Sequence, residues 1–137
     1  PDKFQAPLDS RSDMILSLDH PKVLLVEDDP VTRWIVRTAL KGKCHLATAQ
    51  EANQAIHLYH NYKPDIVFLD INLPGKNGQE VLARLIETDP GAHVIMFSSY
   101  DGMENIISTM EMGAKGFIAK PFDREKLLYY ISRCSNL

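Results

Sequence analysis

The chain has 137 residues, of which 45% are hydrophobic and 24% are charged, and its formal net charge is −3. This length and composition are typical of one globular domain with its own hydrophobic core. The negative charge argues against nonspecific nucleic-acid binding, which depends on basic surface, and no run approaches the ~18 apolar residues of a membrane span.

Residues 1–20 mix Pro, Asp, Ser and Arg around one short apolar patch. They are predicted to be an N-terminal tail or linker, followed by a domain over residues 21–137. They have neither the basic start nor the long apolar segment of a secretory signal. Cys44 and Cys134 fit no metal-ligand spacing, so we expect unpaired thiols in a reducing cytoplasm.

From Lys22 onward, short apolar runs alternate with segments of helical periodicity. Strands are predicted over residues 22–27, 44–48, 66–69, 93–98 and 115–119. Helices are predicted over residues 32–40, 51–61, from 78 onward, 102–112 and 123–135. Such alternation requires parallel strands, because each helix is a right-handed crossover that covers the sheet. The sequence therefore predicts an α/β fold with one doubly wound parallel sheet.

Each predicted helix carries apolar residues at a spacing that places them on one face, toward the core. The residues expected to share such faces are Val31, Ile35, Ala39 and Leu40; Ala52, Ala55, Ile56 and Tyr59; Val81, Leu82, Leu85 and Ile86; Ile106, Ile107 and Met110; and Leu127, Leu128 and Ile131.

Four of the apolar runs end in polar residues. The run ending at Val26 is followed by three acids, Glu27-Asp28-Asp29, and the other runs end at Asp70, Ser98 and Lys120. In open parallel sheets, ligands bind beyond the carboxyl ends of the strands, beside the point where strand order reverses. Crowded carboxylates repel one another, and a hard divalent ion such as Mg2+ would remove the conflict. A carboxylate beside a polarised phosphoryl group can act as a nucleophile, with lysine and hydroxyl groups stabilising the phosphoryl oxygens.

Each of these residues also has a simpler interpretation. Asp29, just before a proline and a predicted helix, fits a helix N-cap better than a ligand. Asp70 can belong to an Asx-type turn, Ser98 can be a loop or capping hydroxyl, and Lys120 can be a solvated charge. Their joint occurrence at the ends of strands in one sheet favours a phosphate- and metal-handling site.

Residues 22–135 resemble the receiver domain of two-component response regulators. The motifs that carry the resemblance are Leu24-Leu25-Val26-Glu27-Asp28-Asp29-Pro30, Asp70-Ile71-Asn72-Leu73-Pro74-Gly75 with Gly78, Phe97-Ser98-Ser99, and Gly113-Ala114-Lys115-Gly116-Phe117-Ile118-Ala119-Lys120-Pro121-Phe122. The resemblance implies a flavodoxin-like (βα)5 fold with the borrowed strand order 2-1-3-4-5.

The resemblance also implies a role for each matching residue. Asp70 matches the phosphoacceptor, Asp28 the direct Mg2+ ligand, Glu27 the second acid that acts through water, Asn72 the ligand that uses its backbone carbonyl, Ser98 the switch hydroxyl, and Lys120 the phosphate-binding lysine. Phe117 falls at the aromatic switch position, and the Lys120–Pro121 bond is expected to be cis by analogy. Tyr100 lies where a bulky side chain could screen the water that removes the phosphoryl group.

By the same resemblance, the partners are a sensor histidine kinase or phosphotransfer protein, or a small phosphodonor, and a downstream effector protein or output domain. The expected protein is cytoplasmic, contacts neither membrane nor nucleic acid, and is no free-standing enzyme, although it assists its own phosphorylation and dephosphorylation.

Three alternatives remain at this point. A haloacid-dehalogenase-type phosphatase needs a second Asp where this chain has Asn72. A flavodoxin-like cofactor binder would carry a Ser/Thr/Gly-rich loop where this chain has Glu27-Asp28-Asp29-Pro30. A degenerate receiver would act as a phosphorylation-independent interaction module, and the complete set of acids, hydroxyl and lysine opposes it.

Overall fold

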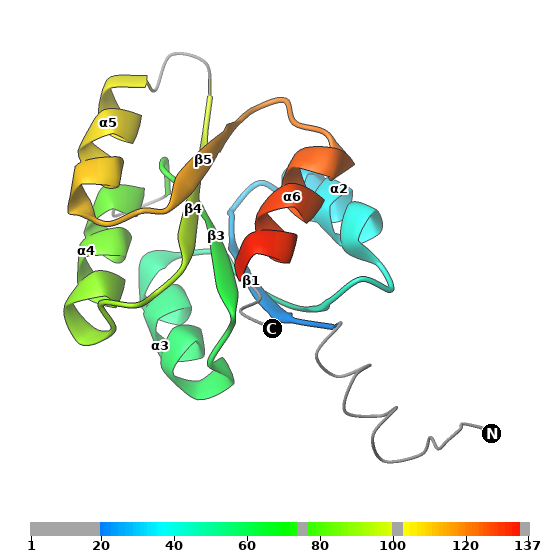
Figure 1. The fold of residues 1–137 in the computed structure, drawn as a ribbon, viewed down its shortest axis with the longest axis horizontal. Coiled ribbons are helices and arrows are strands. Elements are labelled where there is room, and N and C mark those ends of the chain that lie inside the picture. Colours follow the sequence, from blue (N-terminus) through cyan, green and yellow to red (C-terminus); the bar gives the residue numbers. More distant parts are fainter. Residues whose placement is uncertain (1–19, 74–76, 100–102, 135–137) are drawn as a thin grey trace.

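The computed structural model describes residues 20–73, 77–99 and 103–134, although not the side chains of residues 103 and 104. The predicted tail, apart from His20, and Tyr100 lie outside the described residues. Element labels follow Figure 1.

A five-stranded sheet forms the centre of the fold, and all of its neighbouring strands are parallel. The strands are β1 (Lys22–Val26), β2 (His45–Ala49), β3 (Ile66–Asp70), β4 (Val94–Ser98) and β5 (Gly116–Ala119). Their spatial order is β2-β1-β3-β4-β5, which confirms the order implied by the resemblance. The chain adds β2 on one side of β1 and β3 on the other, so the strand order reverses at β1. The carboxyl ends of the parallel strands β1 and β3 therefore lie side by side.

Helices cover both faces of the sheet (Figure 1). They are α2 (Pro30–Leu40), α3 (Ala52–Tyr62), α4 (Gly78–Thr88), α5 (Met103–Met112) and α6 (Arg124–Cys134). Helices α2 and α6 lie on one face, and α3, α4 and α5 lie on the other. Each face has its own buried apolar cluster, because alternate residues of every strand point to opposite sides of the sheet. The central strands β3 and β4 are buried along their whole length, as expected for strands covered on both faces.

Side-chain caps define where three of the helices begin. The Asp29 carboxylate accepts a hydrogen bond from the Thr32 backbone N–H, which confirms the predicted N-cap of α2. Asn77 and Glu80 form a reciprocal capping box at α4, and Glu51 caps α3. These caps satisfy backbone N–H groups that have no partner within the helix.

Two predicted helix faces were partly wrong. Val31 and Ile35 of α2 are 62% and 42% exposed, whereas Val36 and Leu40 are buried. Two adjacent i,i+4 stripes of α2 are apolar, and the sheet covers only one of them. The same ambiguity affects α5, where Ile106 is buried but Ile107 and Met110 are 62% and 42% exposed. The predicted inward residues of α3, α4 and α6 are buried or half-buried.

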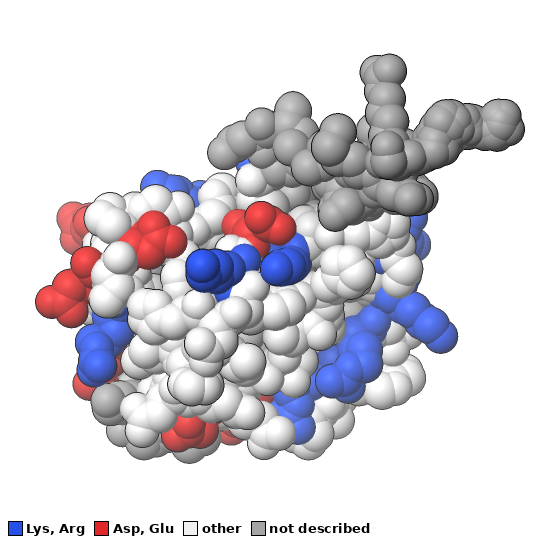
Figure 2. All heavy atoms as spheres, turned by 90° about the horizontal axis from the view of Figure 1, so that it is seen from below, with Lys and Arg blue, Asp and Glu red and all other residues white. Residues whose placement is uncertain are grey.

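Both cysteines are free thiols, as predicted, and both are half-buried. Among the helices that the structure describes, none is long and apolar enough to span a bilayer. Figure 2 views the molecule from the side on which the strands begin; its described residues show small groups of both charge signs separated by uncharged surface.

Candidate functional site

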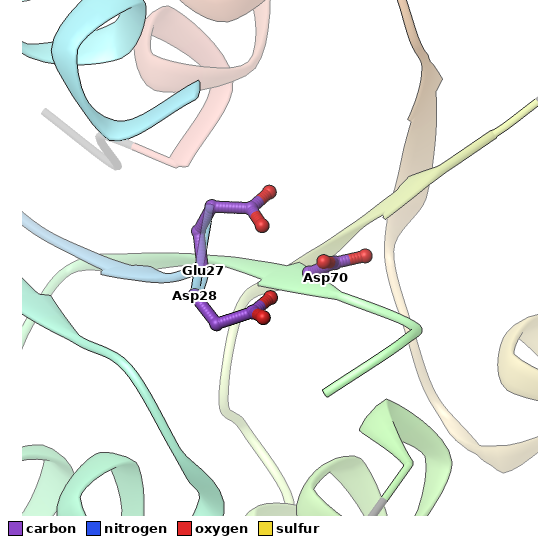
Figure 3. A group of neighbouring side chains, drawn as sticks. All are labelled: Glu27, Asp28 and Asp70. Carbon is purple, nitrogen blue, oxygen red and sulfur yellow. The ribbon is translucent and has the colours of Figure 1, made fainter. Parts of the chain in front are cut away.

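Three carboxylates converge at the carboxyl ends of β1 and β3. Glu27 and Asp28 directly follow β1, Asp70 is the last residue of β3, and the two strands pair in register from Val23 with Ile66 to Val26 with Leu69. Figure 3 shows the Glu27 and Asp28 side chains extending from the end of β1 toward Asp70 at the end of β3. Glu27 and Asp70 are buried and Asp28 is exposed, and one oxygen from each lies within 4.8 Å of the others.

Lys120 brings a positive charge to these carboxylates from the end of the edge strand β5. It follows β5, and its Nζ lies 2.7 Å from Glu27 Oε1 and 3.5 Å from Asp70 Oδ2. The two acids therefore share one ammonium group, whose side chain is 24% exposed. The predicted convergence of the acids and the lysine is what the structure shows.

Burial and the contacts between Lys120 and the acids shift the pKa values of Glu27 and Lys120. Burial raises the pKa of the Glu27 carboxyl to about 7; the Asp70 carboxylate acts in the same direction, and the hydrogen bond from Lys120 opposes it. Burial alone would lower the pKa of Lys120, but its hydrogen bond to Glu27 and the charge of Asp70 outweigh burial, so its pKa is raised. Lys120 therefore stays protonated, and Glu27 is the member of this pair whose charge changes near neutral pH.

Backbone groups hold the carboxylates in place. The Asp29 N–H donates to Glu27 Oε2 at 3.2 Å, and the Asn72 N–H donates to Asp70 Oδ1 at 3.1 Å. The Asn72 side chain itself is exposed. Asp29 takes part as a cap and backbone donor, in agreement with its predicted role outside the ligand set.

Ser98 ends β4, the strand next to β3, but its hydroxyl bonds outside the acidic cluster. It is the last residue of β4 and only 2% exposed, and its Oγ donates to the Ser99 backbone carbonyl at 2.9 Å. Its own carbonyl accepts a hydrogen bond from the Lys120 N–H at 2.8 Å, which ties the ends of β4 and β5 together. The Lys120–Pro121 peptide that follows is cis, as expected.

Two residues that hold the site were missed as functional positions. Arg33 of α2 donates from Nη1 to the backbone carbonyls of Glu27 and Asp28. Gly78, expected only to begin a helix and complete a motif, donates its N–H to the Ile71 carbonyl at 2.7 Å. A Cβ on Gly78 would lie 2.3 Å from the Asp70 carbonyl oxygen, so only glycine fits there. The arginine had no recognisable signal in the sequence.

The donor set fits a hard divalent cation. All three side chains offer oxygen ligands, and they lie close enough to share one ion. Burial raises the pKa of Glu27, and the neighbouring Asp70 carboxylate acts in the same direction. Mg2+ prefers such oxygen ligands and compensates such charge. The residues present therefore fit a magnesium ion.

Along the chain, polar residues stand at the ends of four strands of this parallel sheet: two acids after β1, an aspartate at β3, a hydroxyl at β4 and a lysine after β5. This arrangement defines a receiver-type domain. Comparison with protein-family models matches residues 23–132 to the response regulator receiver domain. The chain belongs to this family of two-component signalling proteins.

Named relatives and solved structures agree. The chain is 35% identical over 112 residues to the chemotaxis protein CheY of Halobacterium salinarum, covering 81% of this chain and 93% of that protein. It is 31% identical over 109 residues to the nitrate/nitrite response regulator NarL of Escherichia coli, covering 77% of this chain but 50% of NarL. The crystal structure of the NtrX receiver domain from Brucella abortus superposes with a TM-score of 0.77 at 31% identity, covering 82% of this chain and 96% of that domain.

Proposed function

We propose that this chain is a phosphorylation-controlled receiver that accepts a phosphoryl group on Asp70 and thereby switches a protein-interaction surface. The observation that carries the proposal is the position of the Asp70 carboxylate. It lies beside the carboxylates of Glu27 and Asp28 and 3.5 Å from the Lys120 ammonium. An anionic phosphoryl group needs this combination of an oxygen nucleophile and nearby positive charge.

Asp28, Asp70 and the backbone carbonyl of Asn72 would hold a Mg2+ ion directly, and Glu27 would act through water. When bound, Mg2+ neutralises the carboxylates and polarises the phosphoryl group. The Asn72 N–H keeps the Asp70 carboxylate oriented. The acids would thus bind the metal ion, and Asp70 would both bind the ion and accept the phosphoryl group.

In the transfer, an Asp70 oxygen forms a bond to phosphorus while the bond between phosphorus and the donor atom breaks. The donor is a phosphohistidine of a sensor kinase or phosphotransfer protein, or a small acyl phosphate. Lys120 neutralises the phosphoryl oxygens, and it can do so while keeping Glu27 because an ammonium has three donors. Most of the rate enhancement comes from positioning and charge neutralisation.

The switch step would exchange the partner of Ser98. A hydrogen bond to a charged oxygen contributes about 1.5–3 kcal/mol, and one to a neutral carbonyl about 0.5–1.5 kcal/mol. Because Ser98 already donates to the Ser99 carbonyl, the gain on moving to the phosphoryl group is only about 1 kcal/mol, roughly a fivefold shift. Repacking of the half-buried Phe117 ring would pass this shift to the surface of α5, β5 and α6.

Receiver domains of response regulators are generally not metabolic enzymes. We propose that this chain likewise has no free-standing catalytic role beyond assisting its own phosphorylation and dephosphorylation. The downstream partner would be an effector protein or an output domain. A cytoplasmic location would supply both Mg2+ and the phosphodonor.

Incubation with acetyl phosphate, with and without Mg2+, tests the proposal by intact-protein mass spectrometry. We expect a Mg2+-dependent phosphoryl adduct that is absent in Asp70→Asn. Asp29→Asn is the matched control, because asparagine keeps the helix cap and removes a neighbouring acid. An adduct that persists in Asp70→Asn would refute Asp70 as the acceptor. No adduct on the parent chain would refute the proposal and favour a phosphorylation-independent module.

Tyr100 lies outside the described residues, and its effect on phosphoryl lifetime stays a prediction. If its ring screens the attacking water, the phosphoryl group on Tyr100→Ala will decay faster than on the parent chain. An unchanged decay rate would contradict this role.

A further inference from the structure

Arg33 makes a contact with the metal-binding loop that the proposed chemistry does not use. Its Nη1 lies 3.1 Å from the Glu27 carbonyl oxygen and 2.7 Å from the Asp28 carbonyl oxygen. One guanidinium nitrogen therefore bridges two consecutive backbone carbonyls of the loop between β1 and α2. We infer that Arg33 is a positioning residue that presets the direction of the Asp28 side chain toward Mg2+; this inference rests on the proposed function.

The argument starts from the rigidity of the peptide unit. The Glu27 carbonyl belongs to the peptide plane before Asp28, and the Asp28 carbonyl belongs to the plane after it. Fixing both carbonyl oxygens fixes both planes that meet at the Asp28 Cα. The side-chain direction of Asp28 depends on these planes, so a contact with the backbone orients a carboxylate that Arg33 need not touch.

Asp28 is the member of the acidic cluster that most needs such support. Glu27 is buried and bonded to both the Asp29 N–H and Lys120, and Asp70 is buried and bonded to the Asn72 N–H. Asp28 is exposed, so surrounding side chains do not confine it to the same degree. Its orientation depends more on its own backbone.

Helix α2 supplies a rigid base for the contact. Asp29 caps the helix through Thr32, and the Arg33 N–H donates to the Asp29 carbonyl at 3.0 Å in the first turn. The guanidinium then reaches back past this turn to the loop that leads into it. The loop is thereby held from both ends by one helix, which lowers the ordering cost of binding the ion.

Mg2+ titration of the metal-free protein by calorimetry tests the inference. Outer-shell partners of metal ligands typically contribute 10- to 100-fold in affinity, so we expect Arg33→Met to raise the Mg2+ Kd roughly tenfold or more. Arg37→Met is the matched control: it removes the same charge one turn further along α2, from an exposed side chain. Its Kd should stay within about twofold of the parent value.

Arg33→Lys separates the contact from the charge and remains useful if Arg33→Met fails to fold. Its ammonium ends one bond short of the Nη1 position, so we expect a Kd several-fold above the parent value. A second readout is the rise in unfolding midpoint on adding Mg2+, which should shrink in Arg33→Met and Arg33→Lys but not in Arg37→Met. A merely structural role would lower the metal-free midpoint and leave this rise unchanged.

The outcomes are distinguishable. Parent-like Mg2+ affinity in Arg33→Lys, or equal losses in Arg33→Met and Arg37→Met, would overturn the inference and leave the proposed function intact. A parent chain that binds no Mg2+ would overturn both.

Discussion

Replacing Gly78 with alanine should damage the site from behind, without changing any polar group. The added Cβ would lie 2.3 Å from the Asp70 carbonyl oxygen and 2.7 Å from Ile71 Cα. The first contact is about 0.7 Å short of the 3.0 Å below which such carbons are essentially never found. Both obstructing atoms belong to the backbone, so no side-chain rotation relieves the clash. The chain around Asp70 must move.

Two effects should follow from this movement. Overpacking costs about 1–3 kcal/mol, and the usual gain from replacing a helical glycine with alanine, about 0.5–1 kcal/mol, offsets part of it. We expect a net loss of about 1–2 kcal/mol in the free energy of unfolding. A displacement of the Asp70 carboxylate approaching 1 Å would slow phosphorylation by up to roughly a hundredfold.

Urea unfolding and the rate of acetyl-phosphate-dependent adduct formation measure the two effects. Gly91→Ala is the matched control, since its Cβ would meet only the Asp89 side chain at 3.6 Å, an ordinary contact. That variant should keep both properties close to those of the parent. Equal stability and equal rate in Gly78→Ala and Gly91→Ala would refute the reasoning.

Three further predictions concern other parts of the described structure. Because burial raises the pKa of Glu27 to about 7, protons and Mg2+ compete near neutral pH, so apparent Mg2+ affinity should rise with pH through that value. Calorimetric titration should show this dependence in the parent chain and lose it in Glu27→Gln. Tyr59→Phe removes the 2.5 Å hydrogen bond from the Tyr59 hydroxyl to Asp89 and should lower the free energy of unfolding by about 1–3 kcal/mol. Urea unfolding measures this loss, and an unchanged midpoint would contradict it. Burial raises the pKa of the Cys44 and Cys134 thiols from 9.0 to about 11, so at pH 8 iodoacetamide should modify the folded chain roughly a hundredfold more slowly than the urea-unfolded chain; comparable rates would contradict the burial argument.

Much of the fold could be predicted because two periodicities alternate along the chain. Fully apolar runs such as Ile66–Leu69 indicate strands buried on both faces, and the intervening segments have helical spacing. Alternation alone does not determine strand order, since many orders satisfy it; the order came from the family resemblance. The buried faces of α2 and α5 could not be predicted, because the sequence offers adjacent apolar stripes and only the tertiary arrangement selects one.

The acidic cluster could be predicted because strand polarity brings the ends of parallel strands to one edge. Lys120 was expected beside the phosphoacceptor, and the structure adds that it lies closer to Glu27 than to Asp70. Two contacts had no sequence signature, the Arg33 bonds to loop carbonyls and the Ser98 bond to the Ser99 carbonyl. Both join a side chain to a backbone oxygen, and any residue type supplies such an oxygen, so residue identity gives no hint of them.

The ion pair between Lys120 and Glu27 joins residues 93 positions apart. During synthesis the ribosome releases all three acids of this pocket long before it releases Lys120, which reaches the acids only when the edge strand β5 docks on β4. A growing chain, or a fragment cut before Lys120, would offer an anionic phosphodonor three carboxylates and no ammonium. Electrostatic repulsion should therefore keep unfinished chains from being phosphorylated, so that phosphorylation of Asp70 becomes possible only once β5 has completed the sheet.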